Sequence, residues 1–297
     1  MYKKPDFNLK NKILFITAIA FVIVMLITNF SIHYIKNKFI ENGMHDYNRY
    51  FQLSYKAIQE SIHEHINHKL NYIIEENNQQ LIKDIFIHQV DYQQTYKKFN
   101  KILKNLQKQA PYAATLHIYD KNGISKIRAH KKDRYGDDLK TIRPMIKSLV
   151  PNPRNSCFFE LGVAGFYFRV VEPIYYNKEL LGFIEIGIKP TIFIKKIKQF
   201  RGVESLFFIK KDFAFQDNHQ SIQQKQIGEY VLYPHFSVSK QNINLIPSSY
   251  QFEDDQKVKF NNHTLMLHTL SINDIYGNEL GKVLSIQDFW LSLKKCG

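Results

Sequence analysis

The chain has few cysteines and none of the spacings that bind metal ions or carry redox chemistry. Its two cysteines are Cys157 and Cys296, and no Cys-x-x-Cys pair occurs in the 297 residues. Two isolated thiols carry no metal or redox signature. Because Cys296 stands next to the last residue, far along the chain from Cys157, we expect no disulfide between them.

The sequence also lacks the motifs of the common enzyme classes. It contains no Walker loop, no GxGxxG fingerprint, no Gly-x-Ser-x-Gly elbow and no kinase or cyclase signature. The triplet Gly136-Asp137-Asp138 matches the GDD of polymerases, but neither a companion carboxylate motif nor a polymerase-sized chain accompanies it. Histidines and aspartates are scattered without a nucleophile, a base and an orienting group. We therefore expect neither an enzymatic activity nor a cofactor.

Charge is unbalanced but not concentrated. The formal net charge is +14, and the lysines and arginines are spread along the chain. A basic balance is found in proteins that bind nucleic acid or an acidic membrane surface. Because no nucleic-acid-binding motif accompanies the charge, a basic, solvated surface is the better interpretation, and nucleic acid is not an expected partner.

One long apolar run stands near the N-terminus. Residues 13–30 carry no charge, and with Ser31 and Ile32 the run reaches the roughly 20 residues that cross a bilayer core as a helix. Four lysines precede it and two follow closely, which places residues 1–12 in the cytoplasm. A cleaved signal peptide is the alternative, but its small-x-small segment, Ala18-Ile19-Ala20, lies in the middle of the run. We predict an uncleaved, single-pass anchor over 13–32 in the inner membrane and a periplasmic main domain.

A long helical section is predicted over residues 33–110. From Ile32 to about Asn77 there is no proline and one glycine, Gly43, so the membrane helix is expected to continue outward with an interruption or a loosening near Gly43. Two further helices are predicted, around residues 81–86 and 92–106, and Pro111 ends the last one.

Three histidines in this section raise the question of a metal site. His65 and His68 share a helix face at i,i+3, and Glu64 and His68 at i,i+4, so Zn²⁺ ligation is geometrically possible. His63 does not begin a zincin motif, because the position four residues later, where that motif has its second histidine, is Asn67. A site needs further ligands that this segment does not supply, and a solvated polar face beside a stripe of isoleucines explains the same residues. We therefore predict no metal.

Alternating apolar residues after Pro111 predict antiparallel strands. The pair Asn122-Gly123 between two such runs is a strong signal for a hairpin. The predicted elements are strands over 115–119 and 124–130, a short helix from Arg143-Pro144, and strands over 166–171 and 180–188 joined by a turn at 177–179. This order describes an α+β module with one sheet and helices on one side, the outline of a PAS-like fold.

The same region carries a series of motifs in a characteristic order. They are Arg128-Ala129-His130, Tyr135-Gly136-Asp137-Asp138, Arg143-Pro144, Glu160 with Gly162, Arg169-Val170-Val171-Glu172-Pro173, and Gly182 with Glu185 and Gly187. In these motifs the chain resembles the double Cache sensor domains found in two-component sensor kinases, chemoreceptors and diguanylate cyclases. The resemblance is dense from about residue 115 to 190 and architectural elsewhere. It implies a long helix that leaves the membrane and backs two stacked PAS-like modules.

A sensor of this fold is expected to hold its ligand between the sheet and the segment that crosses it, here residues 131–143. The candidate ligand-binding residues are Arg128, His130, Tyr135, Asp137, Asp138, Arg143 and Arg169. An arginine can bind a carboxylate through two parallel hydrogen bonds, and an aspartate can hold an ammonium or a hydroxyl group. The expected ligand is a small carboxylate, amino acid or amine. The alternative for each charged residue is a buried ion pair that fixes the loop.

A second, shorter set of strands is predicted in the last third of the chain, over 203–210, 263–272 and 280–287. It lacks the Arg-x-His and Tyr-Gly-Asp-Asp features, so no second ligand site is expected. The expected division is a cytoplasmic tail (1–12), an anchor (13–32), a helical section (33–110), a membrane-distal ligand-binding module (111–196), a membrane-proximal module (197–290) and a tail (291–297).

These features predict a membrane-anchored extracytoplasmic sensor domain, the input part of a receptor. Members of the family usually continue into a second transmembrane helix and a cytoplasmic output domain, whereas residues 289–293 are too few to span a bilayer. We therefore expect either a sensor that passes its state to a separate signalling partner or a truncated receptor. A homodimer that pairs through the long helix is expected. The alternative function is a membrane-tethered adaptor or scaffold that binds a partner through its long helix and basic surface.

Overall fold

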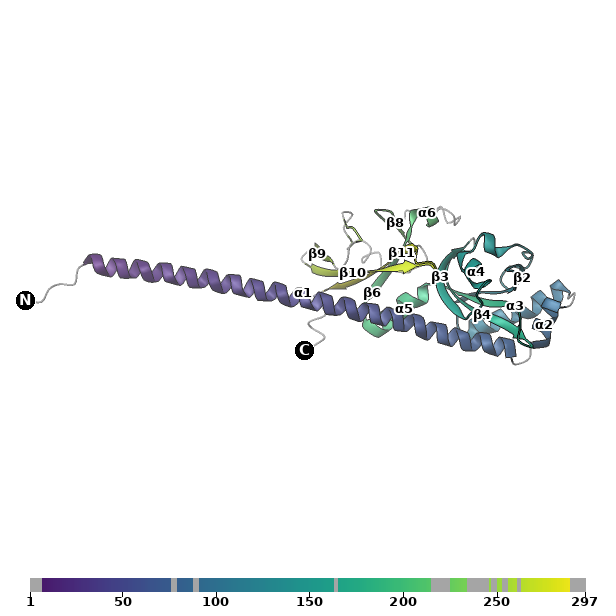
Figure 1. Cartoon of the computed structure of the whole chain (residues 1–297). Helices are drawn as coiled ribbons and strands as arrows, with labels where there is room; N and C mark the ends of the chain where they lie inside the picture. Colours follow the sequence, from purple (N-terminus) through teal and green to yellow (C-terminus); the bar gives the residue numbers. More distant parts are fainter. Residues whose placement is uncertain are drawn as a thin grey trace, which may run out of the picture. The chain divides into compact units, whose positions relative to one another are not determined.

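The computed structural model describes residues 7–75, 79–87, 91–162, 165–214, 225–233, 246, 250–252, 256–260 and 263–288. The chain divides into two compact units, Met1–Phe51 and Gln52–Gly297, and their boundary falls within one long helix, α1 (Phe7–Glu75). The second unit holds two antiparallel sheets (Figure 1). The predicted fold class, a long helix with two PAS-like sheet modules, is confirmed. The predicted tail over 291–297, and Cys296 with it, lies outside the described residues.

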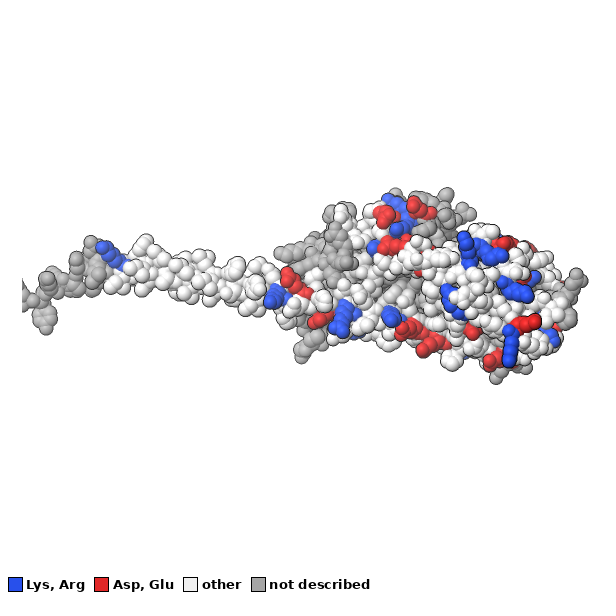
Figure 2. All heavy atoms as spheres, viewed as in Figure 1, with Lys and Arg blue, Asp and Glu red and all other residues white. Residues whose placement is uncertain are grey.

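The N-terminal length of α1 is long and apolar enough to cross a membrane. Its few hydroxyl groups bond within the helix: Thr17 Oγ1 donates to the Ile13 carbonyl at 3.1 Å, and Thr28 Oγ1 to the Val24 carbonyl at 2.9 Å. Such internal bonds suit a helix in lipid, where no water reaches the polar groups. Residues 13–32 of this helix carry no charged side chain, whereas both signs are mixed over the second unit (Figure 2).

The helix runs without a break through Gly43, so the expected interruption there is wrong. A single glycine costs a helix about 1 kcal/mol relative to alanine, which is too little to end a helix whose flanking residues are all helical.

Two shorter helices follow and pack on the first sheet. They are α2 (Gln79–Ile87), which contacts β5, and α3 (Tyr92–Gln109), which contacts β1 and β2. The Asp91 carboxylate caps α3 by accepting a hydrogen bond from Gln93 N at 2.9 Å. The predicted helix over 92–106 is confirmed, and its buried face consists of Thr95, Phe99, Leu103 and Leu106.

The first sheet has five strands in the order β2-β1-β5-β4-β3, all antiparallel. Its elements are β1 (Ala113–Asp120), β2 (Ser125–Arg128), η1 (Leu139–Thr141), α4 (Pro144–Leu149), β3 (Ser156–Gly162), β4 (Gly165–Tyr176) and β5 (Glu179–Ile188). The helix predicted to begin at Pro144 is confirmed. Strand β3 was not predicted from the sequence.

The Asn122-Gly123 hairpin is confirmed. Gly123 has a φ of +80°, which glycine adopts without strain, and its N–H donates to the Asp120 carbonyl at 2.8 Å. Strand β2 ends at Arg128, two residues earlier than expected, so His130 lies in a turn.

Different helices cover the two faces of the first sheet. Successive residues of a strand point to opposite faces, and Tyr119, Val171 and Phe183 pack in a buried cluster with Met145 and Leu149 of α4. On the opposite face, a Cβ built on Gly182 would lie 2.7 Å from Phe86 of α2, and α3 contacts β1 and β2. The expectation of helices on one side is therefore wrong, because the segment between β2 and β3 also folds into α4 and η1.

The second sheet has six strands in the order β7-β8-β6-β11-β10-β9. It is reached through α5 (Thr191–Arg201), and its elements are β6 (Glu204–Lys210), α6 (Lys211–Ala214), β7 (Gln226–Ile227), β8 (Tyr230–Leu232), β9 (Gln256–Phe260), β10 (His263–Asn273) and β11 (Glu279–Asp288). The three predicted strands correspond to β6, β10 and β11. The short strands β7, β8 and β9 were missed.

The two modules contact each other through aromatic side chains and one hairpin. Phe159 of β3 lies with its ring centroid 6.1 Å from that of Phe207 on β6. At the tip of the β10–β11 hairpin, the Tyr276 hydroxyl donates to the Pro144 carbonyl at 3.2 Å. Ile275 beside it packs on the cluster around α4. The second module thus touches the helix that begins next to Arg143.

Candidate functional site

A small cavity lies where the sequence placed the ligand, between the first sheet and residues 131–143. Its volume is about 60 Å³. Four of the seven predicted residues line it: Arg128, His130, Arg143 and Arg169. Seven further residues complete the lining, namely Thr115, His117, Lys131, Arg134, Leu139, Ile142 and Gly162.

Arg128 is committed to Asp137. Its two terminal nitrogens donate to the two Asp137 carboxylate oxygens at 2.6 and 2.7 Å, and one of them also donates to the Arg134 carbonyl at 2.9 Å. The hydrogen bond from Arg128 lowers the pKa of Asp137. These two parallel hydrogen bonds fix the crossing loop. They correspond to the ion pair that the sequence analysis gave as the alternative for these two residues.

Arg143 and Arg169 share two carboxylates that the sequence analysis did not assign to the site, Glu160 and Glu185. Arg143 donates from Nε to Glu160 at 2.8 Å and from Nη2 to Glu185 at 2.6 Å. Arg169 donates from Nη1 to Glu185 at 2.5 Å, and its Nε lies 2.9 Å from Glu160. At most 6% of any of these four residues is exposed. The four residues form a closed ion-pair network, in which each of the two arginines contacts both glutamates.

The two arginines keep the Glu185 carboxylate ionised. Burial raises the pKa of Glu185, but Arg143 and Arg169 outweigh it and hold that pKa at about 2. Glu160 also accepts a hydrogen bond from Met145 N at 3.2 Å, at the start of α4. The charge network therefore ties the central strands of the sheet to the helix that the second module touches.

The cavity has an excess of positive charge. Three of its five lysine and arginine side chains are neutralised by Asp137, Glu160 and Glu185. In the described part of the chain, Lys131 and Arg134 make no ion pair and no side-chain hydrogen bond. No aspartate or glutamate is among the lining residues. An anion, rather than a cation, is what this lining can hold.

The two histidines of the lining are neutral near pH 7. Burial lowers the pKa of His130 to about 4, and burial lowers the pKa of His117 well below its usual value. His117 Nε2 lies 2.9 Å from Ser125 Oγ. His130 Nδ1 is buried and has no hydrogen-bond partner among the residues that the structure describes.

The other three predicted residues lie outside the lining. Tyr135 is 56% exposed and stacks on Tyr92, with 3.9 Å between ring centroids. Asp137 is held by Arg128, and Asp138 caps η1 by accepting a hydrogen bond from Lys140 N at 2.9 Å. Contact of any of the seven residues with a ligand stays a prediction.

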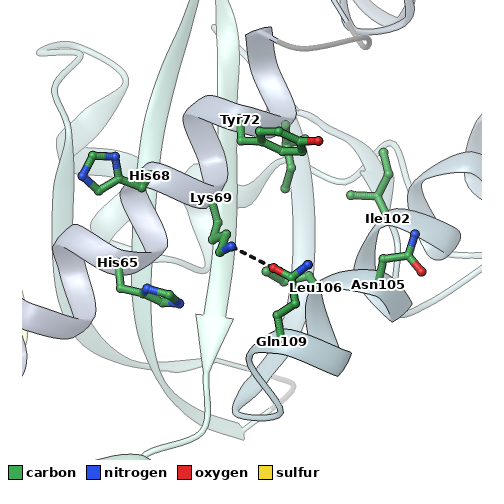
Figure 3. A pocket seen from close by; sticks show the side chains of 9 residues that line it. His65, His68, Lys69, Tyr72, Ile102, Asn105, Leu106 and Gln109 are labelled. Carbon is green, nitrogen blue, oxygen red and sulfur yellow. Dashed lines mark hydrogen bonds between the residues drawn. The ribbon is translucent and has the colours of Figure 1, made fainter.

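A larger groove of about 570 Å³ lies between α1 and α3 (Figure 3). Its walls include Tyr72, Ile102 and Leu106, and Lys69 donates across it to Gln109 at 2.8 Å. The His65 ring points toward Gln109, whereas the His68 ring points away from it (Figure 3). Within the described ranges, no cluster of three metal-ligating side chains occurs. The two histidines therefore do not converge on a common point.

Several solved structures are similar to this chain over most of its length. Solved structures of similar shape include the extracellular domain of the histidine kinase vpHK1S-Z8, with 11% identity and a TM-score of 0.47 over 86% of this chain and 95% of that chain. Another is the ligand-binding domain of the Pseudomonas fluorescens chemoreceptor CtaA in complex with L-isoleucine (14% identity, TM-score 0.44, 87% of this chain and 98% of that chain). A third is the ligand-binding domain of the Pseudomonas aeruginosa PAO1 chemoreceptor PctB in complex with L-Arg (12% identity, TM-score 0.42, 83% and 96%).

The comparison with curated proteins gave no match. The family model dCache_3, a double sensory domain of two-component sensor kinase, matches residues 42–231. Since this match covers more than half of the chain, and the motifs between residues 115 and 190 predicted the same family, the chain belongs to the double Cache family of sensor domains.

Proposed function

We propose that the chain is a membrane-anchored, extracytoplasmic sensor domain that binds a small polar ligand in the cavity of its first module. The observation that carries this proposal is a pair of cationic side chains, Lys131 and Arg134, which line the cavity beside a buried ion network and make no ion pair among the described residues. Ionisable groups that converge on one cavity are a mark of binding sites. Membership of a sensor family supports the same function.

The anchor would be the apolar length of α1, with its N-terminus in the cytoplasm. The exposed apolar side chains from Ile13 to Ile32 are suited to contact with lipid. The lysines before the run, including Lys10 and Lys12, favour the cytoplasmic side for the N-terminus. The anchor would then cross the inner membrane, and the globular unit would lie in the periplasm. Its membrane-distal module would be residues 111–196 and its membrane-proximal module residues 197–290.

Signalling would start at the crossing loop. A ligand that engages Arg134 and Lys131 would draw residues 131–143 toward the sheet, and Arg143 would carry the change to α4. A homodimer paired through α1, or a separate signalling partner, would receive it.

A thermal-shift screen of the full chain in detergent tests this function. A ligand that binds only the folded state raises the melting temperature by mass action. We expect a hit in a library of carboxylates, amino acids and amines, and its loss in the double variant Lys131→Gln/Arg134→Gln. Lys132→Gln is the matched control, because Lys132 is exposed on the same loop but does not line the cavity. A hit that the double variant leaves unchanged would contradict the proposed site.

The second candidate is a membrane-tethered adaptor, and the groove between α1 and α3 is the observation that favours it. A silent screen on a well-folded sample would favour the adaptor over the sensor.

A further inference from the structure

We infer that the ligand of the first cavity is a short-chain carboxylate that carries no ammonium group. The inference rests on the proposed function and narrows it, because the cavity offers donors for an anion and no partner for a cation. Three observations carry it: the donors that remain free, the absence of a carboxylate in the lining, and the size and walls of the cavity.

The free donors converge from the loop and from β4. Lys131 and Arg134 have no ion pair among the described residues. Arg169 Nη1 donates to Glu185 and Nε lies 2.9 Å from Glu160, whereas Nη2 has no hydrogen bond in the described part of the chain. A Cβ built on Gly162 would lie 3.0 Å from that Nη2. Because Gly162 has no side chain, the third nitrogen of Arg169 stays open toward the cavity.

An ammonium group would have no charged partner in this cavity. Asp137, the residue expected to hold an amine, is bound by both terminal nitrogens of Arg128 and is not part of the lining. Glu160 and Glu185 are each shared by two arginines. Burying an ammonium without an acceptor is unfavourable, and the two cationic side chains without an ion pair, Lys131 and Arg134, would repel it. Amino acids and amines are therefore disfavoured.

The size and the apolar walls of the cavity determine what the rest of the ligand can be. With a volume of about 60 Å³, the cavity suits a small ligand. Leu139 and Ile142 add apolar wall on the loop side. A short alkyl tail suits that wall, whereas sulfate or phosphate has no apolar part to place there. Propionate has the required size, charge and tail.

A matched set of probes tests the inference by isothermal titration calorimetry on the full chain in detergent. The probes are propionate, L-alanine, n-propylamine and sulfate. L-Alanine is propionate with an added ammonium group, so the pair isolates the cost of that group. We expect propionate to bind, L-alanine to bind at least about tenfold more weakly, and n-propylamine not to bind.

Two variants locate the binding and keep the test independent of folding. The double variant Lys131→Gln/Arg134→Gln should weaken propionate by at least about tenfold, whereas Lys132→Gln should leave it unchanged. Gly162→Ala keeps every charge but covers Arg169 Nη2, and should also weaken propionate. A melting curve for each variant shows whether it is folded.

The outcomes separate the inference from the proposed function. Binding of L-alanine as tight as that of propionate, lost in the double variant, would overturn the carboxylate assignment and leave the sensor site standing. Sulfate bound as tightly as propionate would overturn it too, because charge alone would then suffice. Failure of all four probes would overturn the inference, and the proposed function would fall with it only if the broader thermal-shift screen were also silent.

Discussion

The two sheets of the globular unit share a hairpin design but bury different kinds of side chain. The first sheet buries charged residues in its central strands, among them Arg169 and Glu185. The described core of the second sheet is apolar, and its buried polar residues, Ser205, His268, Thr269 and Ser285, include no lysine, arginine, aspartate or glutamate.

The difference indicates a division of labour. Buried ion pairs often stabilise a protein less than apolar residues of the same size would, so their presence in one sheet calls for a reason other than stability. In the first module they surround a cavity with free donors. The second module is stabilised by the packing of its apolar core. The family's Arg-x-His and Tyr-Gly-Asp-Asp features are absent from it.

The sharpest test of this comparison removes one charge from the first network. Glu185→Gln keeps the shape of the side chain but leaves Arg143 and Arg169 with one carboxylate between them. We expect a loss of about 3–5 kcal/mol in the free energy of unfolding, because a buried charge then lacks its partner. Ser285→Ala, at an equally buried position of β11, should cost only about 1 kcal/mol. Urea unfolding of the full chain in detergent measures both, and equal losses would contradict the contrast between the sheets.

A second pair of variants tests what the modules share. Gly182 in β5 and Gly281 in β11 both face a neighbouring strand so closely that an added Cβ would collide with a backbone carbonyl, of Tyr119 and of Phe208 respectively. Gly182→Ala and Gly281→Ala should each cost about 1–3 kcal/mol by overpacking. Melting temperatures of the two variants should fall by similar amounts. A large loss for one and none for the other would show that the two hairpins are not built alike.

Acid should weaken the first module before the second. His130 has its pKa lowered by burial to about 4, so its contribution to stability is complete above its usual value of 6.5 and is lost as the pH falls toward 4. For Glu185, with a pKa of about 2, the contribution is present above its usual 4.5 and is lost below it. Amide hydrogen exchange, corrected for intrinsic rates, should therefore show β1 and β5 losing protection between pH 7 and pH 4 before β6 and β11.

His130→Asn provides the control for the acid experiment, because asparagine does not titrate in this range. In that variant the loss between pH 6.5 and pH 4 should shrink. Uniform loss of protection across both sheets would argue against a first module that is selectively sensitive to acid.

The smallest expected effect concerns the contact between the modules. Tyr276→Phe removes the exposed hydrogen bond to the Pro144 carbonyl and should lower the free energy of unfolding by at most about 1 kcal/mol. If α4 transmits ligand binding to the second module, the same variant should leave propionate affinity nearly unchanged while reducing the ligand-induced protection of the β10–β11 hairpin in hydrogen exchange. Unchanged protection would remove Tyr276 from the coupling.

Much of the fold could be predicted because its signals are local. Asn122-Gly123 forces a turn, Pro144 suits a first helical turn, and the apolar period of 92–106 defines α3. The short strands β7 and β8 carry too few residues to show a period. Gly43 was given too much weight, since one glycine does not end a long helix.

The site could be predicted only in part, because its pairings depend on contacts between distant residues. Arg143 and Arg169 were assigned to the cavity, but Glu160 and Glu185 meet them only through the register of β3, β4 and β5. Asp137 was assigned to a ligand, with a buried ion pair as the alternative, and the loop folds it onto Arg128. The signal that could have found His117 is its alternation with Tyr119 on β1, a strand that the sequence did reveal.

The measurement that tests the central claim most directly is a crystal structure of the full-length protein. The crystals are grown with propionate, and the globular unit is the part to be resolved. The account predicts density for the carboxylate beside Lys131, Arg134 and Arg169 Nη2, with the alkyl end against Leu139 and Ile142. Propionate bound in the groove between α1 and α3, or bound nowhere while the cavity keeps its shape, would contradict it.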